Sequence, residues 1–273
     1  MNPKLWRKLR RTGITLAVLF SLYFLMAYGV LPAYWRHYEH NPGLEETPKT
    51  TFKAWGKPGD PLNVGLVGTE EEIVQAMTKA GWQPATRKTI RAGLKIAESE
   101  LLKRPYPNAP VSNLYLWGRR QDLAFEQVLS KGPGKRHHVR FWQAGDLGQI
   151  GRPLWIGAAT FDRSVGFSRL TGEITHHIAP DVDAERDKLM ADLQRAGQLV
   201  KTYQVTGVGA TLRATNGEGD WYYTDGELTV GILSPDNMVQ TMPPVELTIP
   251  KKIKAKNSIW KSLGRALKFF EKF

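Results

Sequence analysis

The sequence predicts an α+β domain, in which a mixed β-sheet carries helices packed on one face, plus one N-terminal transmembrane helix and a C-terminal amphipathic helix. Three observations lead to this fold class. An uncharged apolar run lies near the N-terminus, short segments with strand patterns alternate with amphipathic helical patterns in the middle, and the basic C-terminal tail repeats its apolar residues with helical spacing.

Composition divides the 273-residue chain into five segments. The fourth segment is long enough to bury one core of ordinary size. In order, the segments are a cytoplasmic basic leader (1–13), a transmembrane helix (14–31), a linker rich in proline and glycine (32–60), the α+β domain (61–240), and a Pro-rich linker that continues into a basic amphipathic tail (241–273).

Residues 14–31 form an uncharged run of 18 residues. At 1.5 Å per residue a helix of this length spans about 27 Å, close to the hydrocarbon core of a bilayer. Two alternatives stay open, a buried core helix and a cleaved signal peptide, although Ala27-Tyr28-Gly29 is a poor cleavage site. The side chains that we expect in lipid include Ile14, Leu16, Leu22, Phe24 and Leu31.

The formal charge of +12 comes entirely from the two ends of the chain, because residues 1–13 carry +5 and residues 251–273 carry +7. The region between them is neutral, which argues against a nucleic-acid-binding surface on the domain. A basic leader before the apolar run predicts a cytoplasmic N-terminus, an inner-membrane span and a periplasmic domain. With no cysteine, the chain has neither disulfides nor thiolate chemistry.

Local patterns place the elements of the domain in order. Thr69 and Glu72 form a capping box before a helix that Gly81 ends, and Gly197 ends a helix over 183–196. A further helix is predicted over 88–102. The predicted strands are 62–67, 114–117, 123–128, 138–142, 154–161, 173–178, 202–208 and 227–233.

The basic tail predicts an interfacial helix on anionic lipid, because its apolar residues share one helical face and most of its lysines lie off it. A helix docked on the domain and a disordered tail are the alternatives. The side chains expected to touch the membrane include Trp260, Leu263, Leu267 and Phe270.

Four of the six histidines come as the pairs His137-His138 and His176-His177, each on a predicted strand. Adjacent strand residues face opposite sides of a sheet. If helices cover the Val139 and Phe141 side, His138 and Arg140 lie on the open side of the sheet. One histidine of each pair then converges with Asp162.

Three interpretations of these residues remain. His138, His177 and Asp162 form a catalytic acid–base site or, failing that, ligate a metal, although no metal or other cofactor is assigned. Phosphate or another anion would bind to Arg119, Arg120 and Arg140. Alternatively, the histidines are hydrogen-bonded structural residues, and Asp122, Asp162 and Glu126 pair with arginines. The carboxylates of residues 181–185 are explained by the start of a helix.

Several motifs together resemble the LssY C-terminal domain family of bacterial envelope proteins over about residues 60–236. The resemblance implies a membrane-associated envelope protein, but provides no catalytic residues, and the membrane segments of longer relatives are missing. The motifs are Asn63-Val-Gly-Leu-Val-Gly68, Ala80-Gly-Trp82, Arg104-Pro-Tyr106, residues 114–126, Arg136-His-His-Val-Arg-Phe-Trp142, residues 153–162, His176-His177 and residues 181–186.

Two functional hypotheses follow. The first is an accessory or binding module at the membrane face, with membrane lipid and envelope proteins as partners. The second is a membrane-tethered hydrolase of a phosphorylated lipid or cell-wall precursor that uses the paired histidines, arginines and Asp162. The sequence does not decide whether the protein is an enzyme, and it leaves the oligomeric state open.

Overall fold

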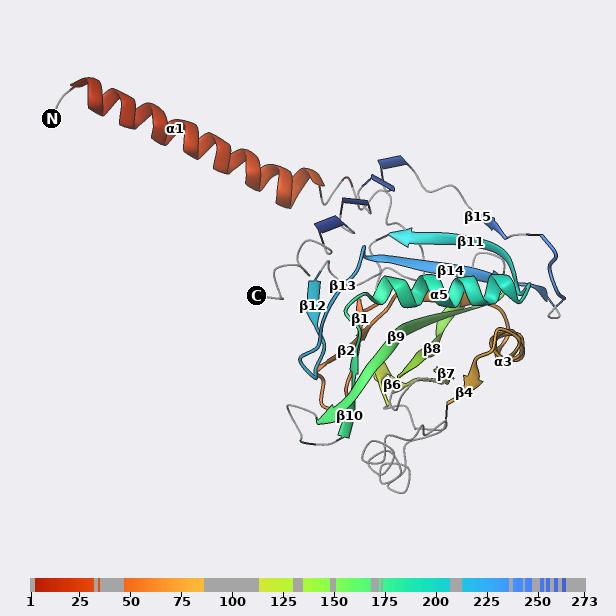
Figure 1. Ribbon diagram of the computed structural model, residues 1–273. Helices are drawn as coiled ribbons and strands as arrows, with labels where there is room; N and C mark the ends of the chain where they lie inside the picture. Colours follow the sequence, from red (N-terminus) through yellow and green to blue (C-terminus); the bar gives the residue numbers. More distant parts are fainter. Residues whose placement is uncertain are drawn as a thin grey trace. The chain divides into compact units, whose positions relative to one another are not determined.

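The computed structural model describes residues 3–31, 34, 47–85, 113–129, 135–147, 151–167, 172, 174–206, 213–235, 238–242, 244–246, 251–252, 254–255, 258–259 and 262–263. The chain divides into two compact units, 1–41 and 42–273. Among the described residues, the first unit contains one long helix, and the second contains the sheets and the helices α3 (Glu70–Lys79) and α5 (Val182–Arg195) (Figure 1).

Helix α1 covers Pro3–Leu25 and continues as a π-helical turn over Met26–Val30. Together they make 28 residues, long and apolar enough to cross a membrane. The expected lipid-facing residues, Ile14, Leu16, Leu22, Phe24 and Leu31, are all exposed, and no residue of either segment is buried in protein. The structure therefore gives no support to the alternative of a buried core helix.

A mixed sheet of nine strands is the framework of the second unit within the described residues. Its strands are β3 (Val64–Val67), β4 (Gln83–Pro84), β7 (Leu123–Val128), β8 (Arg136–Leu147), β9 (Pro153–Phe167), β10 (Ile174–Ile178), β11 (Leu199–Thr206), β14 (Glu227–Leu233) and β15 (Val245–Glu246). The order is β15-β11-β14-β3-β9-β8-β7-β4, and β10 pairs with the last part of β9. The pairs β14–β3 and β11–β15 are parallel and the other pairs are antiparallel.

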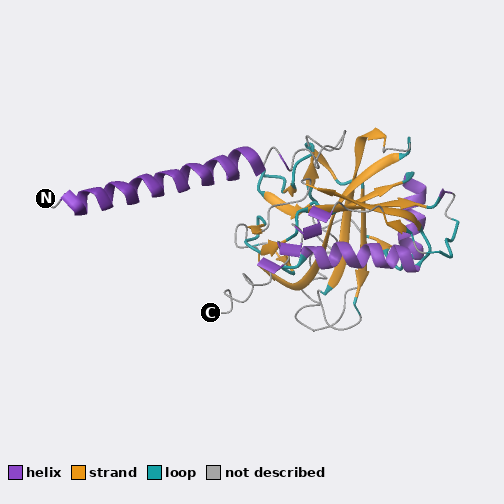
Figure 2. Cartoon of the chain, turned by 90° about the horizontal axis from the view of Figure 1, so that it is seen from above, coloured by secondary structure: helices purple, strands orange, loops and turns teal. Residues whose placement is uncertain are grey.

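Helices α3 (Glu70–Lys79) and α5 (Val182–Arg195) cover one face of this sheet, and Figure 2 shows the sheet and helices from above. Both helices contribute to a single apolar core with the strands beneath them, which confirms the predicted packing of helices on one face. This core includes Ile73, Met77, Trp82, Phe125, Phe141, Trp155, Leu189 and Leu193.

Side-chain caps explain where the two helices begin. Thr69 accepts a hydrogen bond from the Glu72 amide (3.2 Å), and Glu72 accepts one from the Thr69 amide (2.7 Å), as the capping box predicts. Asp181 caps α5 by accepting from the Ala184 amide (3.2 Å). Gly81 and Gly197 follow the helices with positive φ angles of 83° and 66°, which glycine adopts without strain.

A second sheet covers the opposite face of the main sheet. Its order is β2 (Pro58–Pro61), β1 (Thr50–Phe52), β5 (Tyr115–Leu116) and β6 (Arg119–Arg120). Leu62, Leu114 and Leu116 form a second apolar core with main-sheet residues such as Trp142 and Ile156. The expectation that this face is open is therefore wrong. A separate hairpin joins β12 (Arg213–Thr215) to β13 (Trp221–Tyr223).

Three regions differ from the predicted boundaries or lie outside the described residues. Strands β1 and β2 fall inside the predicted linker (32–60), so the domain begins earlier than expected. The predicted helix over 88–102 lies outside the described residues. In the tail, the described pairs between 251 and 263 are helical and Leu263 is exposed, while Trp260, Leu267 and Phe270 lie outside the described residues, so the amphipathic helix stays a prediction.

Candidate functional site

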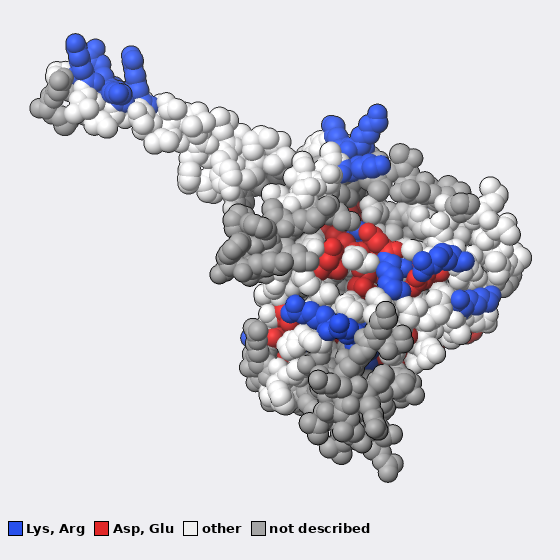
Figure 3. Space-filling view, in the orientation of Figure 1, with Lys and Arg blue, Asp and Glu red and all other residues white. Residues whose placement is uncertain are grey.

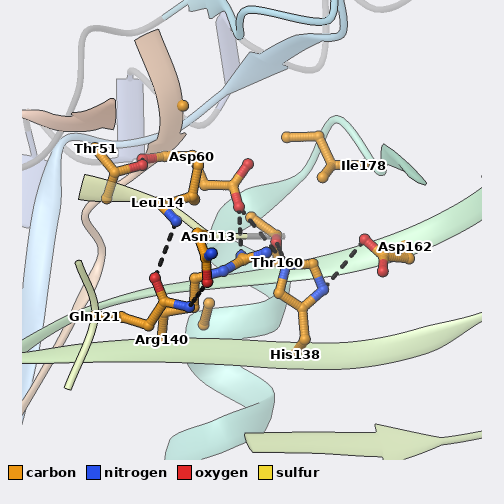
Figure 4. A network of polar contacts seen from close by, with 12 residues as sticks. Thr51, Asp60, Asn113, Leu114, Gln121, His138, Arg140, Thr160, Asp162 and Ile178 are labelled. Carbon is orange, nitrogen blue, oxygen red and sulfur yellow. Dashed lines mark hydrogen bonds and ion pairs between the residues drawn. The ribbon is translucent and has the colours of Figure 1, made fainter. Parts of the chain in front are cut away.

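His138 lies between the two sheets. Strand β8 pairs with β9 so that His138 is opposite Thr160 and Arg136 is opposite Asp162. Because strand residues alternate, Val139 and Phe141 face the helices, and His138 and Arg140 face the small sheet (Figure 4). The predicted sides are thus correct, but His138 is only 2% exposed.

Asp60, at the end of β2, connects the small sheet to the main sheet. Arg140 Nη1 donates to Asp60 Oδ2 over 2.8 Å, and His138 Nε2 lies 3.6 Å from the same oxygen. The hydroxyl of Thr160 is 2.8 Å from His138 Nε2. The three groups around the imidazole therefore come from both sheets, so any change in its charge acts on the contact between the sheets.

Arg136 extends the cluster to a third strand. Its Nε donates to Asp162 Oδ2 over 2.9 Å and its Nη1 donates to Glu126 Oε2 on β7 over 2.7 Å. Three buried carboxylates (Asp60, Glu126 and Asp162) thus face two buried guanidinium groups. Formal charge balances within the cluster only when His138 is protonated.

The electrostatics favour that protonated state. Burial alone would lower the pKa of His138, but the charge of Asp162 and the contacts with both aspartates outweigh it and raise the pKa. Burial would likewise raise the pKa of Asp162 and of Asp60, but His138 and the nearby arginines lower both, and they hold the pKa of Asp162 well below its ordinary value. Burial raises the pKa of Glu126, since Arg136 offsets only part of that cost.

The contact between His138 and Asp162 is an ion pair rather than an aligned hydrogen bond. His138 Nδ1 and Asp162 Oδ1 lie 3.1 Å apart, but the angles at this contact are not those of a hydrogen bond. Within the described part of the chain, neither atom has a hydrogen-bond partner. A buried imidazole held in this way takes up a proton to become an imidazolium and can release it again.

Of the second histidine pair, His176 is the residue that interacts electrostatically with Asp162 of this cluster. Burial lowers its pKa to about 4, and the charge of Asp162 offsets only part of the shift. His176 is therefore neutral at physiological pH, whereas the pKa of His138, near the same carboxylate, is raised.

His177 lies apart from the other two predicted catalytic residues. Its Nδ1 is 2.9 Å from Asp220 Oδ1, in the turn between β12 and β13, and the other oxygen of Asp220 accepts from the Ile178 amide over 3.1 Å. The structure thus brings His138 and Asp162 together and directs His177 to a different carboxylate. A register shift between His177 and Ile178 interrupts the regular alternation of β10 here.

The predicted anion-binding arginines are separated too. Arg140 is buried against Asp60. Arg119 pairs with Asp122, and its guanidinium stacks 5.7 Å from the ring of Trp117. Arg120 is exposed at the edge of the small sheet. The interpretation that Asp122, Asp162 and Glu126 pair with arginines is confirmed.

Metal ligation by His138, His177 and Asp162 has no geometric support, because the described residues contain no group of three His, Asp or Glu side chains that could hold a metal ion. Sequence reasoning missed Asp60, Thr160 and Arg136. Thr160 and Arg136 lie directly across the β8–β9 ladder from His138 and Asp162, so strand pairing was the signal that could have found them. Asp60 was hidden in a segment with the composition of a linker.

Comparison with known proteins identifies the family. The model of the LssY C-terminus matches residues 44–228, which is more than half of the chain and includes every member of the His138 cluster. No curated protein and no solved structure matches. The match also contains β1 and β2, in agreement with the earlier start of the domain. The chain therefore belongs to the LssY C-terminus family.

Proposed function

We propose that the protein is an accessory or binding module held at the inner membrane by α1, with its N-terminus in the cytoplasm and its domain in the periplasm. The observation that carries the non-catalytic role is the closure of the His138 cluster. His138, Asp162 and Asp60 are at most 7% exposed. His138 contacts the two aspartates, whereas His177 contacts Asp220.

The anchor and the basic ends support the membrane location. Helix α1 begins with Lys4, Arg7, Lys8, Arg10 and Arg11 and then becomes apolar, the order that keeps an N-terminus in the cytoplasm. The tail adds eight lysines and arginines over residues 251–273. Each cation near an anionic bilayer contributes about 1 kcal/mol, so lipid contact by the tail belongs to this proposal.

A topology reporter tests the orientation. Alkaline phosphatase, which is active only after export, is fused after Phe273 of the full chain, and a green fluorescent protein that matures only in the cytoplasm is fused in a parallel version. We expect phosphatase activity without fluorescence, in the membrane fraction. Fluorescence without phosphatase activity would show that the domain is cytoplasmic, and recovery of the intact chain in the soluble fraction would reject the anchor.

A phosphate-release assay tests the choice between module and hydrolase. The full chain in detergent is incubated with phosphatidic acid and with a polyprenyl pyrophosphate, and the matched variant is His177→Gln. His177 is half-buried and outside the His138 cluster, so this variant is expected to fold. We expect no phosphate release from either protein. Release by the native chain that His177→Gln abolishes would establish the hydrolase instead.

A further inference from the structure

Two hairpins of the main sheet turn at the same end of the domain. Val128 on β7 pairs with Arg136 at the start of β8, and Arg136 pairs with Asp162 on β9. Strand β9 then continues past β8 to Phe167 and pairs with β10, so the β9–β10 hairpin projects beyond the β7–β8 turn (Figure 1). We call this end, with its residues Leu129, Lys135, Arg163 and Phe167, the hairpin end.

The hairpin end combines exposed apolar and basic side chains. Phe167 is 71% exposed and Leu129 is 37% exposed, although both belong to apolar residue types that usually lie in cores. Lys135 is exposed, and the Arg163 side chain is 51% exposed although it lies 3.9 Å from Asp220. Apolar tips flanked by cations are the pattern of surfaces that enter the headgroup region of anionic bilayers.

The turn between β1 and β2 extends the same end. Lys53 pairs with Glu218 over 3.2 Å and the Gly217 amide donates to the Pro58 carbonyl, so this turn packs on the loop 216–220. The same loop holds His177 on β10 through Asp220. Trp55, in the β1–β2 turn, is 49% exposed, and tryptophan favours the membrane interface.

The opposite end of the sheet also exposes apolar side chains, but there two exposed glutamates accompany one exposed cation, Arg195, which lies just before Gly197 and its contact with Val239. Met238, Val239 and Met242 are exposed there, after the end of β14. Strand β3 ends beside them, because Val67 pairs with Ile232, and it leads directly into the exposed Glu70 and Glu71 of α3. Both ends therefore expose apolar side chains, and the difference between them is their charge. An anionic lipid surface repels the two exposed glutamates of this end.

We propose that the hairpin end docks on the anionic phospholipid surface of the membrane that holds α1. This inference rests on the proposed membrane anchoring and adds which face of the domain meets the lipid. Residues 32–49 have a contour length of up to about 60 Å, whereas a domain of this size has a radius of gyration of roughly 17 Å. The tether thus allows either end to reach the bilayer, and the cations select the hairpin end.

Because the chain has no cysteine, a single introduced cysteine can be labelled with a dye at one chosen position, which allows a direct test of the docking surface. Full-length Phe167→Cys, Met242→Cys and Leu22→Cys are each labelled with an environment-sensitive dye. The proteins are reconstituted in vesicles of phosphatidylcholine alone or of phosphatidylcholine mixed with phosphatidylglycerol. Insertion is read from the blue shift of the dye and from its quenching by lipids that carry a spin label.

We expect the dye at position 167 to shift and to be quenched in vesicles with phosphatidylglycerol, and to respond less in phosphatidylcholine alone. The dye at position 242 stays in a water-like environment in both. Replacing Lys135 and Arg163 by glutamine removes the response at position 167, whereas Arg195→Gln, which removes a cation next to the end of α5, leaves it unchanged.

The Leu22 label separates the two levels of the proposal. If it is not quenched by lipid, the anchoring itself fails. If it is quenched but the dye at position 167 responds no more than the dye at position 242, the anchor stands and the docking surface is rejected. An equal response at position 167 in neutral and anionic vesicles would reject the headgroup charge as the cause of docking.

Discussion

Two buried ionic clusters of the domain differ in how their charges are satisfied. In the first, Arg186 at the start of α5 forms a bidentate pair with Asp225 (2.7 and 3.1 Å) and also donates to the Glu227 carbonyl (3.1 Å). The space-filling view shows acidic side chains gathered on the surface around the start of α5 (Figure 3). In the second, His138 contacts Asp162 without an aligned hydrogen bond and shares Asp60 with Arg140.

The difference separates a permanent link from one that can titrate. Burial alone would lower the pKa of Arg186, but its hydrogen bonds and ion pairs with Asp225 raise it above the ordinary value, so the guanidinium stays charged at every physiological pH. The other cluster contains an imidazole besides its two guanidinium groups, and imidazole is the side chain whose charge ordinarily changes near neutrality. The first cluster fastens the segment before β14 to α5, and the second links the two sheets through Arg140 and through the titratable His138.

Replacing the permanent link should have the largest effect. Arg186→Met leaves Asp183 and Asp225 buried without their cation, and breaking a buried ion pair from one side costs about 3–5 kcal/mol. We expect a loss of this size in the free energy of unfolding, measured by urea titration of the detergent-solubilised full chain with tryptophan fluorescence. A loss below about 1 kcal/mol would show that solvent reaches the cluster.

The matched control for this prediction neutralises the partner as well. The double variant Arg186→Met with Asp225→Asn should recover part of the stability, because the buried charge left behind is removed. No recovery would indicate that the packing of the Arg186 stem, rather than its charge, holds the loop.

Removing the titratable cation should have the next largest effect, and one that depends on pH. The folded-state pKa of His138 is raised, so its stabilisation is complete below its unfolded value of about 6.5 and is lost as the pH rises through the folded value. We expect His138→Gln to cost about 2–3 kcal/mol at mildly acidic pH, since a hydrogen-bonded charge is lost. The difference from the native chain should shrink as the pH rises above about 6.5.

The measurement is the same urea titration repeated across the alkaline range. A difference that stays constant with pH would mean that His138 is neutral in the folded protein, and the charge balance of the cluster would then need another cation. The result would leave the Arg186 cluster unaffected, which keeps the comparison intact.

His176 should show a pH dependence opposite to that of His138, because its pKa is lowered rather than raised. Its folded-state pKa is lowered to about 4, so its contribution is complete above the unfolded value of about 6.5 and is lost as the pH falls towards 4. We expect His176→Gln to reduce the acid-induced loss of stability by roughly 1–2 kcal/mol at pH 5. Thermal unfolding between pH 7.5 and 4.5 measures it, and identical acid limbs in variant and native chain would contradict it.

Local interactions made the helix ends and central strands predictable from the sequence. Thr69 and Glu72 satisfy each other across three residues, so the pattern is complete within the segment that contains it. Strands β1 and β2 are different. Pro58, Gly59 and Pro61 have the composition of a linker, and the segment pairs as strands because β5 lies beside β1, more than sixty residues further along the chain.

For the site, too, the local pattern was predictable from the sequence, and the long-range contacts were not. Alternation along β8 correctly separated His138 and Arg140 from Val139 and Phe141. It did not reveal that a second sheet closes this side, because that sheet is built from the segments with the weakest strand signal. Nor did it reveal whether His176 or His177 belongs with Asp162, since that choice depends on the register of β10 on β9.

The smallest loss of stability should come from removing Arg195, the exposed partner of the buried carboxylate Asp192. Asp192 accepts from Trp82 Nε1 (2.9 Å) and Lys188 Nζ (2.6 Å), and it also pairs with Arg195, whose side chain is 74% exposed. We expect Arg195→Ala to cost less than about 1 kcal/mol, because two partners remain and solvent screens the lost charge. The cost should fall further in high salt, whereas that of Arg186→Met should not, since a dry ion pair is screened far less. Equal salt sensitivity of the two variants would show that burial is not what separates the permanent link from a surface pair.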